Sequence, residues 1–142
     1  MEKIRVLVAD DHSLLRRGLV KLLEMTDEVV VVGQAVNGEE VVELTEQLQP
    51  DIILMDINMP KLNGIEATRQ IIDTHNIPIL ALTIHDDEEY IAEMIRAGAH
   101  GYILKDSELS SLVQAIKRVA AGETFFPSHL MEKVMAKFHE LV

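Results

Sequence analysis

Three carboxylates, a hydroxyl and an ammonium stand at the ends of short apolar runs in this sequence. In chain order they are Asp10, Asp11, Asp56, Thr83 and Lys105. Carboxylates that lie close together repel one another and need positive charge nearby. Lys105 supplies one charge, and Mg²⁺ suits a site of a few carboxylates, waters and phosphate oxygens. A carboxylate beside a bound cation and a lysine can act as a nucleophile toward phosphorus, so Asp56 is the candidate phosphoryl acceptor.

These side chains meet only if the apolar runs are parallel strands of one sheet. The runs are nearly continuous in apolar character, as strands covered on both faces are, and they alternate with helical patterns. That order predicts an α/β fold, a five-stranded parallel sheet with helices on both faces. In such a sheet ligands bind beyond the carboxyl ends of the strands, where the candidate residues fall. The expected strands are Ile4–Ala9, Val29–Ala35, Ile52–Met55, Ile79–Thr83 and Gly101–Leu104.

Each helical stretch has apolar residues at helical spacing, which we expect to face the sheet. The expected faces are Leu15, Leu19 and Leu22; Val41, Leu44 and Leu48; Ile65, Thr68 and Ile72; Ile91, Met94 and Ile95; and Leu112, Ala115, Ile116 and Val119. Asn37 followed by Glu40 resembles a capping box, and Ser13 and Ser107 are placed to cap their helices.

Length and charge limit the possible functions. The chain has 142 residues, which suits one domain, and a formal net charge of -11. An acidic chain is repelled by the phosphate backbone, so we expect no direct nucleic-acid binding by these residues. There are no cysteines, which favours a reducing compartment. No stretch approaches the roughly 20 apolar residues of a membrane span. We therefore expect a cytoplasmic protein without membrane contact.

Taken together, these residues resemble the receiver domain of two-component response regulators, which we assign to residues 1–122. The resemblance implies a flavodoxin-like fold with strand order 2-1-3-4-5. It implies a signalling switch, not an enzyme, that takes part in a phosphorelay. It rests on Asp10-Asp11, on Asp56 with Met59-Pro60 and Gly64 behind it, on Thr83, and on Tyr102 with Lys105.

The resemblance also assigns roles to single residues. Asp56 corresponds to the phosphoacceptor, and the donor would be a sensor histidine kinase. Thr83 and Lys105 would bind the phosphoryl oxygens, and Tyr102 would swing inward when Thr83 moves. Mg²⁺ would be held by Asp10, Asp11, Asp56 and the backbone carbonyl of Asn58. Many family members have a cis proline after the lysine, where this chain has Asp106, so a cis or a trans bond remains open.

The C-terminal part resembles one subfamily, through residues 82–86 and 121–126. That subfamily joins the receiver to a LuxR-type helix-turn-helix domain that binds DNA and regulates transcription. Residues 123–142 would then be a linker and an amphipathic tail helix, leading to an output domain that this chain lacks, and we expect truncation. The tail stripe also allows a homodimer. It consists of Leu130, Val134, Met135, Phe138 and Leu141.

Other functions fit the pattern less well. A Mg²⁺-dependent phosphatase usually has an acid two residues after its nucleophile, where this chain has Asn58. A phosphorylation-independent interaction module would not need the complete set of acids, Thr83 and Lys105. A flavin or dinucleotide binder would carry a Gly-x-Gly-x-x-Gly loop, and none follows a strand. His12 and His85 are read as surface residues, with tuning of the phosphate lifetime as the alternative.

Overall fold

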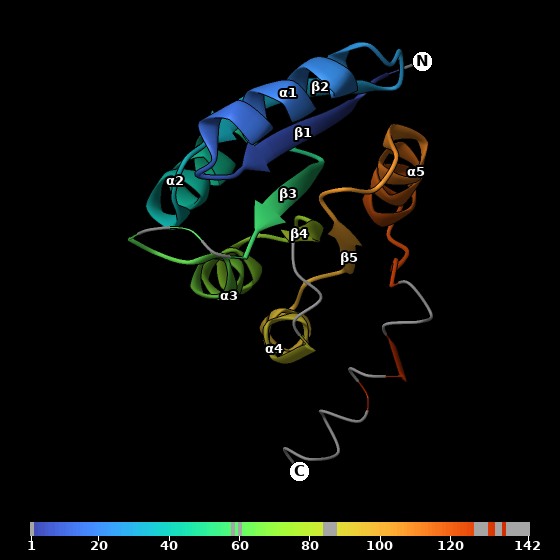
Figure 1. The fold of residues 1–142 in the computed structure, drawn as a ribbon. Helices are drawn as coiled ribbons and strands as arrows, with labels where there is room; N and C mark the ends of the chain where they lie inside the picture. The colour runs from blue at the N-terminus through green and yellow to red at the C-terminus, as the bar shows by residue number, and fades with distance from the viewer. Residues whose placement is uncertain are drawn as a thin grey trace.

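Strands and helices alternate along the chain from β1 to α5 (Figure 1). The structure is a computed structural model and describes residues 2–57, 59, 61–83, 88–126, 131–132 and 135. The strands are β1 (Ile4–Ala9), β2 (Val29–Ala35), β3 (Ile52–Asp56), β4 (Ile79–Thr83) and β5 (Gly101–Leu104). The helices are α1 (Ser13–Glu24), α2 (Gly38–Leu48), α3 (Gly64–Thr74), α4 (Glu88–Ala97) and α5 (Leu109–Ala120).

The five strands form one parallel sheet in the order β2-β1-β3-β4-β5, which confirms the predicted fold. The strand positions match the sequence prediction, except that β3 runs one residue further and includes Asp56. Strands β3 and β4 are buried at every position, as expected for strands covered on both faces. Chain order and spatial order differ at β1, which lies between β2 and β3.

Helices cover both faces of the sheet and make two separate cores (Figure 1). Helices α2, α3 and α4 cover one face, and α1 and α5 cover the other. The predicted face of α5 is fully confirmed, because all four of its residues are buried. Burying one such aliphatic side chain stabilises the fold by roughly 1.5–3 kcal/mol relative to leaving it exposed.

The predicted apolar face of α1 is confirmed only in part, because Leu19 alone of its three leucines packs against the core. The residues that α1 buries are Arg16, Val20 and Leu23, whereas Leu15 and Leu22 are about half exposed. Leucines occur on two sides of this helix, so helical spacing alone could not choose between them. The face with Val20 and Leu23 meets Val6 and Val8 of β1, and the other face is left beside α5.

Of the three predicted helix caps, Asn37 is confirmed, and Ser13 and Ser107 are wrong. The Asn37 side chain accepts a hydrogen bond from the Glu40 backbone N–H at 2.9 Å, as predicted. Ser13 and Ser107 do not cap, because the positions with extended backbone before α1 and α5 are His12 and Glu108, and neither makes a side-chain cap bond. Ser13 already lies inside the helix.

The segment after α5 returns to the edge of the sheet. The Tyr102 backbone N–H donates to the Phe125 carbonyl at 2.9 Å, and the Phe125 N–H donates to the His100 carbonyl at 3.1 Å. The predicted tail helix lies mostly outside the described residues, as do Pro127 and four members of its stripe. Among the described residues, no helix combines the length and the apolar character that crossing a membrane requires.

Gly64, the first residue of α3, packs directly on the end of β3. Its N–H donates to the Ile57 carbonyl at 2.9 Å, and a β-carbon here would overlap the backbone oxygen of Asp56. We predict that Gly64→Ala lowers the free energy of unfolding by about 1–3 kcal/mol, because the loop behind Asp56 must shift. Urea unfolding measures this change.

Gly18→Ala is the matched control. Gly18 lies inside α1, and a β-carbon there would meet nothing within 4 Å. This substitution should stabilise the fold by about 0.5–1 kcal/mol, because alanine favours helix more than glycine does. Equal effects of the two substitutions would contradict the close approach of Gly64 to β3.

Candidate functional site

The parallel register brings the strand ends to one edge. Ala9 pairs with Met55, Asp56 with Leu82, and Thr83 with Leu104. The residues that follow therefore emerge together, and the Lys105 N–H extends the ladder by donating to the Thr83 carbonyl at 2.8 Å. The structure thus places Asp10, Asp11, Asp56, Thr83 and Lys105 at the same edge, as the sequence predicted.

Lys105 lies between two buried carboxylates. Its Nζ is 2.7 Å from Asp10 Oδ2 and 3.4 Å from Asp56 Oδ2. Asp10 is 1% exposed and Asp56 is 4% exposed, so water screens these charges little. A single ammonium thus serves two buried carboxylates, and the third, Asp11, is about one third exposed.

His12 lies against the same acids. Its backbone N–H donates to Asp10 Oδ1 at 2.9 Å. Its ring Nδ1 lies 3.0 Å from Asp10 Oδ1, 3.3 Å from Asp11 Oδ1 and 3.9 Å from Asp56 Oδ2. In the sequence His12 directly follows the two acids, and we predicted it to be a surface residue. The ring is half exposed, yet one of its nitrogens faces the cluster.

Arg16 supports the site from behind and was missed by the sequence analysis. It is 7% exposed, and its guanidinium donates to the Asp10 carbonyl at 2.9 Å and to Gln34 Oε1 at 3.0 Å. These bonds tie the turn after β1 to both α1 and β2. The sequence did contain a signal for this role, because Arg16 lies at helical spacing from Val20 and Leu23 and so falls on the same face of α1. An arginine on a buried helix face needs a buried hydrogen-bond partner.

The two buried carboxylates differ in acidity. The pKa of Asp56 is raised to about 6, because burial, with a contribution from the nearby Asp10 charge, outweighs the lowering effect of the Lys105 ammonium. Burial also raises the pKa of Asp10, but the bonds from Lys105 and His12 outweigh it and leave that pKa below its ordinary value. Lys105 therefore stabilises the ionised form of Asp10, whereas the ionised form of Asp56 is less favoured than that of a carboxylate in water.

The donor set fits a divalent cation. Oxygens of Asp10, Asp11 and Asp56, with a His12 nitrogen, all lie within 4.8 Å of one another. Asp11 Oδ1 and Asp56 Oδ2 are buried and accept no hydrogen bond within the described part of the chain. Buried oxygens without donors are costly, and a hard cation such as Mg²⁺ would satisfy them. Asn58, the remaining predicted ligand, lies outside the described residues, as does His85.

The other predicted residues lie close to this cluster. Thr83 is 8% exposed at the end of β4, and Tyr102 is 1% exposed in the core under α4. The Tyr102 ring is therefore in an inward position in this structure. The peptide bond between Lys105 and Asp106 is trans, which answers the question that the sequence left open.

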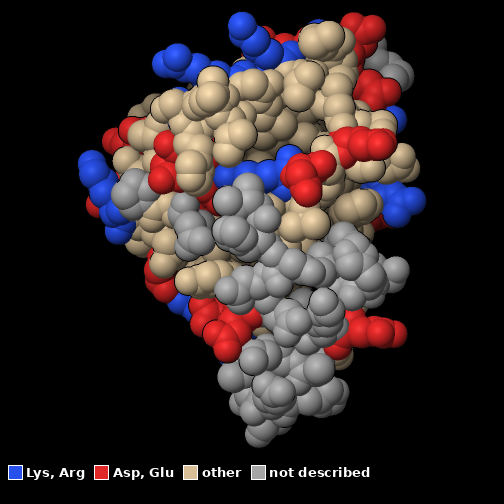
Figure 2. Space-filling model, viewed as in Figure 1, with Lys and Arg blue, Asp and Glu red and all other residues tan. Residues whose placement is uncertain are grey.

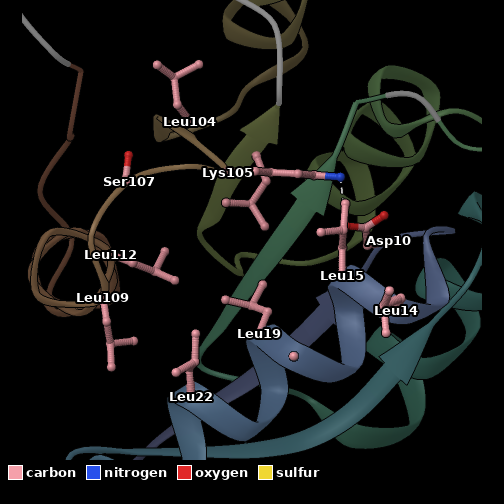
Figure 3. Close-up of a pocket in the computed structure, with 12 residues that line it drawn as sticks. Asp10, Leu14, Leu15, Leu19, Leu22, Leu104, Lys105, Ser107, Leu109 and Leu112 are labelled. Atoms are coloured by element: carbon pink, nitrogen blue, oxygen red, sulfur yellow. Dashed lines mark ion pairs between the residues drawn. The ribbon is translucent and has the colours of Figure 1, made fainter.

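An apolar groove of about 260 Å³ lies between α1 and α5 and reaches the site. Leu15, Leu19 and Leu22 line it from α1, while Lys105 crosses toward Asp10 at one end (Figure 3). Leu109 and Leu112 of α5 face them from the other side. Figure 2 shows this face with mostly uncharged atoms around a hollow.

Comparison with known proteins agrees with this geometry. The response regulator receiver domain family matches residues 6–117. The transcriptional regulatory protein DegU of Brevibacillus brevis is 42% identical over 141 residues, which are 99% of this chain and 60% of that protein. The response regulator GacA of Pseudomonas viridiflava is 39% identical over 135 residues, 94% of this chain and 63% of that protein. The chain thus spans about three fifths of the length of these relatives.

Solved structures give the same result. A LuxR-family two-component response regulator from Aurantimonas sp. SI85-9A1 aligns with a TM-score of 0.86 and 31% identity, covering 96% of this chain and 98% of that one. The receiver domain of the NarL regulator from Mycobacterium tuberculosis aligns with a TM-score of 0.83 and 34% identity, over 87% and 100%. The relatives are thus regulators of the LuxR and NarL type.

The raised pKa of Asp56 predicts a pH-dependent stability. Above pH 6 the folded protein holds this buried charge at a cost, whereas the unfolded chain, with a pKa near 3.8, ionises freely. We predict that Asp56→Asn raises the free energy of unfolding by about 2–3 kcal/mol at pH 8 without divalent cation. The gain should shrink as the pH falls through 6 and vanish near pH 4, as measured by urea unfolding.

Asp73→Asn is the matched control, since Asp73 is an exposed carboxylate on α3. It should leave stability unchanged across this range. A gain for Asp56→Asn that is independent of pH would contradict the buried-charge interpretation. Added Mg²⁺ should reduce the difference in free energy of unfolding between Asp56→Asn and the wild type at pH 8, because Mg²⁺ stabilises only the ionised carboxylate.

Proposed function

This chain belongs to the response regulator receiver domain family, and from that membership we propose that it is a phosphorylation-dependent signalling switch whose input is Asp56. The observation that carries the proposal is the Asp56 carboxylate itself. It is buried at a strand end, has one oxygen without a hydrogen-bond donor in the described residues, and lies 3.4 Å from the Lys105 ammonium. This combination suits a nucleophile toward phosphorus more than a structural ion pair.

The transfer step follows from these positions. A pKa of about 6 leaves Asp56 mostly ionised at pH 7 and above, so it can attack. One carboxylate oxygen bonds to phosphorus while the bond between phosphorus and the donor breaks. We propose a phosphohistidine of a sensor kinase as donor. Its ring, protonated on the other nitrogen, keeps the electron pair of the broken bond and leaves as neutral imidazole. Lys105 neutralises charge on the phosphoryl oxygens as they arrive.

A cation would complete the charge balance. Asp10, Asp11 and Asp56, with the Asn58 carbonyl, would hold Mg²⁺. Bound there, Mg²⁺ supplies positive charge to the transferring group and to the three acids. The protein's own part is to fix the acids in place, through the bonds of His12 and Arg16 to Asp10.

The phosphorylated state would be read through β4 and β5. Phosphorylation replaces a single carboxylate charge by about -1.5 to -2 and adds acceptor oxygens. We propose that Thr83 and Lys105 bind those oxygens and that the Tyr102 ring responds. Any shift of β5 also reaches the segment after α5, because Tyr102 and Phe125 share a backbone hydrogen bond. Gly101 permits this approach, since a β-carbon there would lie 2.9 Å from the Phe125 oxygen.

The proposed output is control of transcription. The relative DegU is named a transcriptional regulatory protein, and the chain spans about three fifths of its length. We propose that a LuxR-type helix-turn-helix domain, joined through residues 123–142, binds the DNA. The receiver itself is too acidic for that role, with a net charge of -11.

We further propose that phosphorylation changes self-association through the α1 face. Leu14 is 86% exposed, and Leu15 and Leu22 are about half exposed, so an apolar surface is left without cover among the described residues. A second copy of the chain could bury it symmetrically. The surface borders Lys105, whose Nζ lies 3.4 Å from Asp56 Oδ2. Lys105 would therefore connect phosphorylation of Asp56 with self-association through the α1 face.

Phosphoryl uptake is the direct test. With acetyl phosphate and Mg²⁺, we predict that the wild-type chain gains the mass of one phosphoryl group, whereas Asp56→Asn gains none. Lys105→Met should slow uptake by at least about tenfold, because a preorganised charge at the transferring group is lost. Intact mass spectrometry over time measures all three.

Asp73→Asn serves again as the matched control and should be phosphorylated like the wild type. Uptake by Asp56→Asn at the wild-type rate would contradict the assignment. Hydrolysis of a free phosphate ester with turnover would instead indicate a phosphatase.

Oligomeric state tests the proposed assembly face. With beryllofluoride and Mg²⁺, sedimentation should show a larger dimer fraction for the wild type. The double substitution Leu14→Gln and Leu22→Gln should abolish that rise, whereas Tyr90→Gln, which changes an exposed aromatic on α4, should not. Loss of the rise only in Tyr90→Gln would move the interface to α4, and no rise in the wild type would exclude this assembly.

A further inference from the structure

His12 places a nitrogen among the oxygens of the acidic site. We propose that His12 Nδ1 is a fourth ligand there, so that the site takes a borderline divalent transition metal, of the series from Mn²⁺ to Zn²⁺, as well as Mg²⁺. The inference rests on the proposed function, because it uses the same three carboxylates. It adds a ligand and a class of metal to that site.

The distances match a shared coordination shell. Ligand atoms about 2.1 Å from one ion lie about 3.0–3.4 Å apart when they are adjacent around it, and about 4.2 Å apart when opposite. His12 Nδ1 lies 3.0 Å from Asp10 Oδ1, 3.3 Å from Asp11 Oδ1 and 3.9 Å from Asp56 Oδ2. All these atoms lie within 4.8 Å of one another. The three distances from His12 Nδ1 thus fall within the span of one shell, and small side-chain rotations would bring all four groups onto one ion.

Two buried oxygens also point to a ligand at this site. Asp56 Oδ2 and Asp11 Oδ1 are buried atoms that accept no hydrogen bond within the described chain, and the nearest ammonium, Lys105 Nζ, lies 3.4 Å from Asp56 Oδ2. These are two of the three carboxylate atoms that face His12 Nδ1. The oxygens that lack donors and the imidazole nitrogen therefore converge on the same small space.

The position of His12 is fixed by its own backbone. His12 is the residue before α1, with an extended conformation, and its side chain does not cap the helix. Its N–H donates to Asp10 Oδ1, which anchors the residue at the acid that Lys105 and Arg16 also hold. The ring is thus free from a capping role and is held at the rim of the site.

The nitrogen changes which metals are favoured. Mg²⁺ prefers oxygen ligands and keeps several waters, so it gains little from an imidazole. Imidazole suits Zn²⁺ and its neighbours in the first transition row, and mixed sites of histidine and carboxylate are typical of them. Coordination requires the ring proton to reside on Nε2, so the proton that Nδ1 shares with Asp10 moves there or to solvent.

The alternative is that Nδ1–H remains a hydrogen-bond donor to Asp10. In that case the ring would occupy part of the cation's space and would oppose every divalent metal alike. If His12 is a ligand, removing the ring lowers the preference for Zn²⁺ over Mg²⁺. If the ring only donates to Asp10, removing it leaves that preference unchanged.

The experiment is a pair of calorimetric titrations, with Zn²⁺ alone and with Mg²⁺ alone, on the full 142-residue chain. For His12→Gln, we expect the ratio of Zn²⁺ to Mg²⁺ affinity to fall at least about tenfold, because even an outer-shell group of a metal site is worth 10–100-fold. His75→Ala, which removes a partly exposed histidine on the far end of α3, should leave the ratio unchanged.

A spectroscopic readout identifies the ligand atom. In nitrogen-15 spectra of the histidine rings, Zn²⁺ should shift the Nδ1 signal of His12, and Mg²⁺ should not. An unchanged affinity ratio with an unshifted Nδ1 signal would overturn this inference, while Mg²⁺ binding that depends on Asp56 would leave the proposed function intact. If neither metal binds the wild type, both fail.

Discussion

Three carboxylates meet at one edge of this sheet, and the rest of the site is a response to their repulsion. Two of them are almost fully buried, where water cannot screen their charges. One ammonium, that of Lys105, approaches Asp10 at 2.7 Å and Asp56 at 3.4 Å. This unequal sharing stabilises the charge of Asp10 and leaves that of Asp56 costly. A group whose charge is costly is the one that gains most from a bound cation.

The fold explains how such a costly cluster persists. The acids lie at the carboxyl ends of β1 and β3, and the strands behind them contribute apolar side chains to both cores. Arg16 and Gly64 then fix the two loops, one through the Asp10 carbonyl and the other by close packing on the Asp56 backbone. Because these supports come from α1, β2 and α3, the stability of the whole domain maintains the repulsion. A bound divalent cation would offset this repulsion.

Much of this arrangement follows from the sequence, because a parallel sheet sends every strand end to the same edge. The positions of Asp10, Asp56, Thr83 and Lys105 needed only the strand boundaries. Finer features did not follow. Leucines on two sides of α1 hid its buried face, and Arg16 was overlooked because an arginine is usually exposed. The caps at Ser13 and Ser107 failed because a serine near a helix start does not show which residue has extended backbone. The partner of Lys105 depends on distances of a few tenths of an ångström, which no pattern encodes.

The central claim is that the phosphoryl group is carried by the carboxylate of Asp56. The most direct measurement is reductive trapping, in which borohydride converts an aspartyl phosphate to homoserine and leaves free carboxylates unchanged. The chain is treated with acetyl phosphate and Mg²⁺, reduced, digested and sequenced by tandem mass spectrometry. Homoserine should be found at position 56 and at neither Asp10 nor Asp11. Homoserine at position 10 or 11, or none at position 56 in a phosphorylated sample, would contradict the claim.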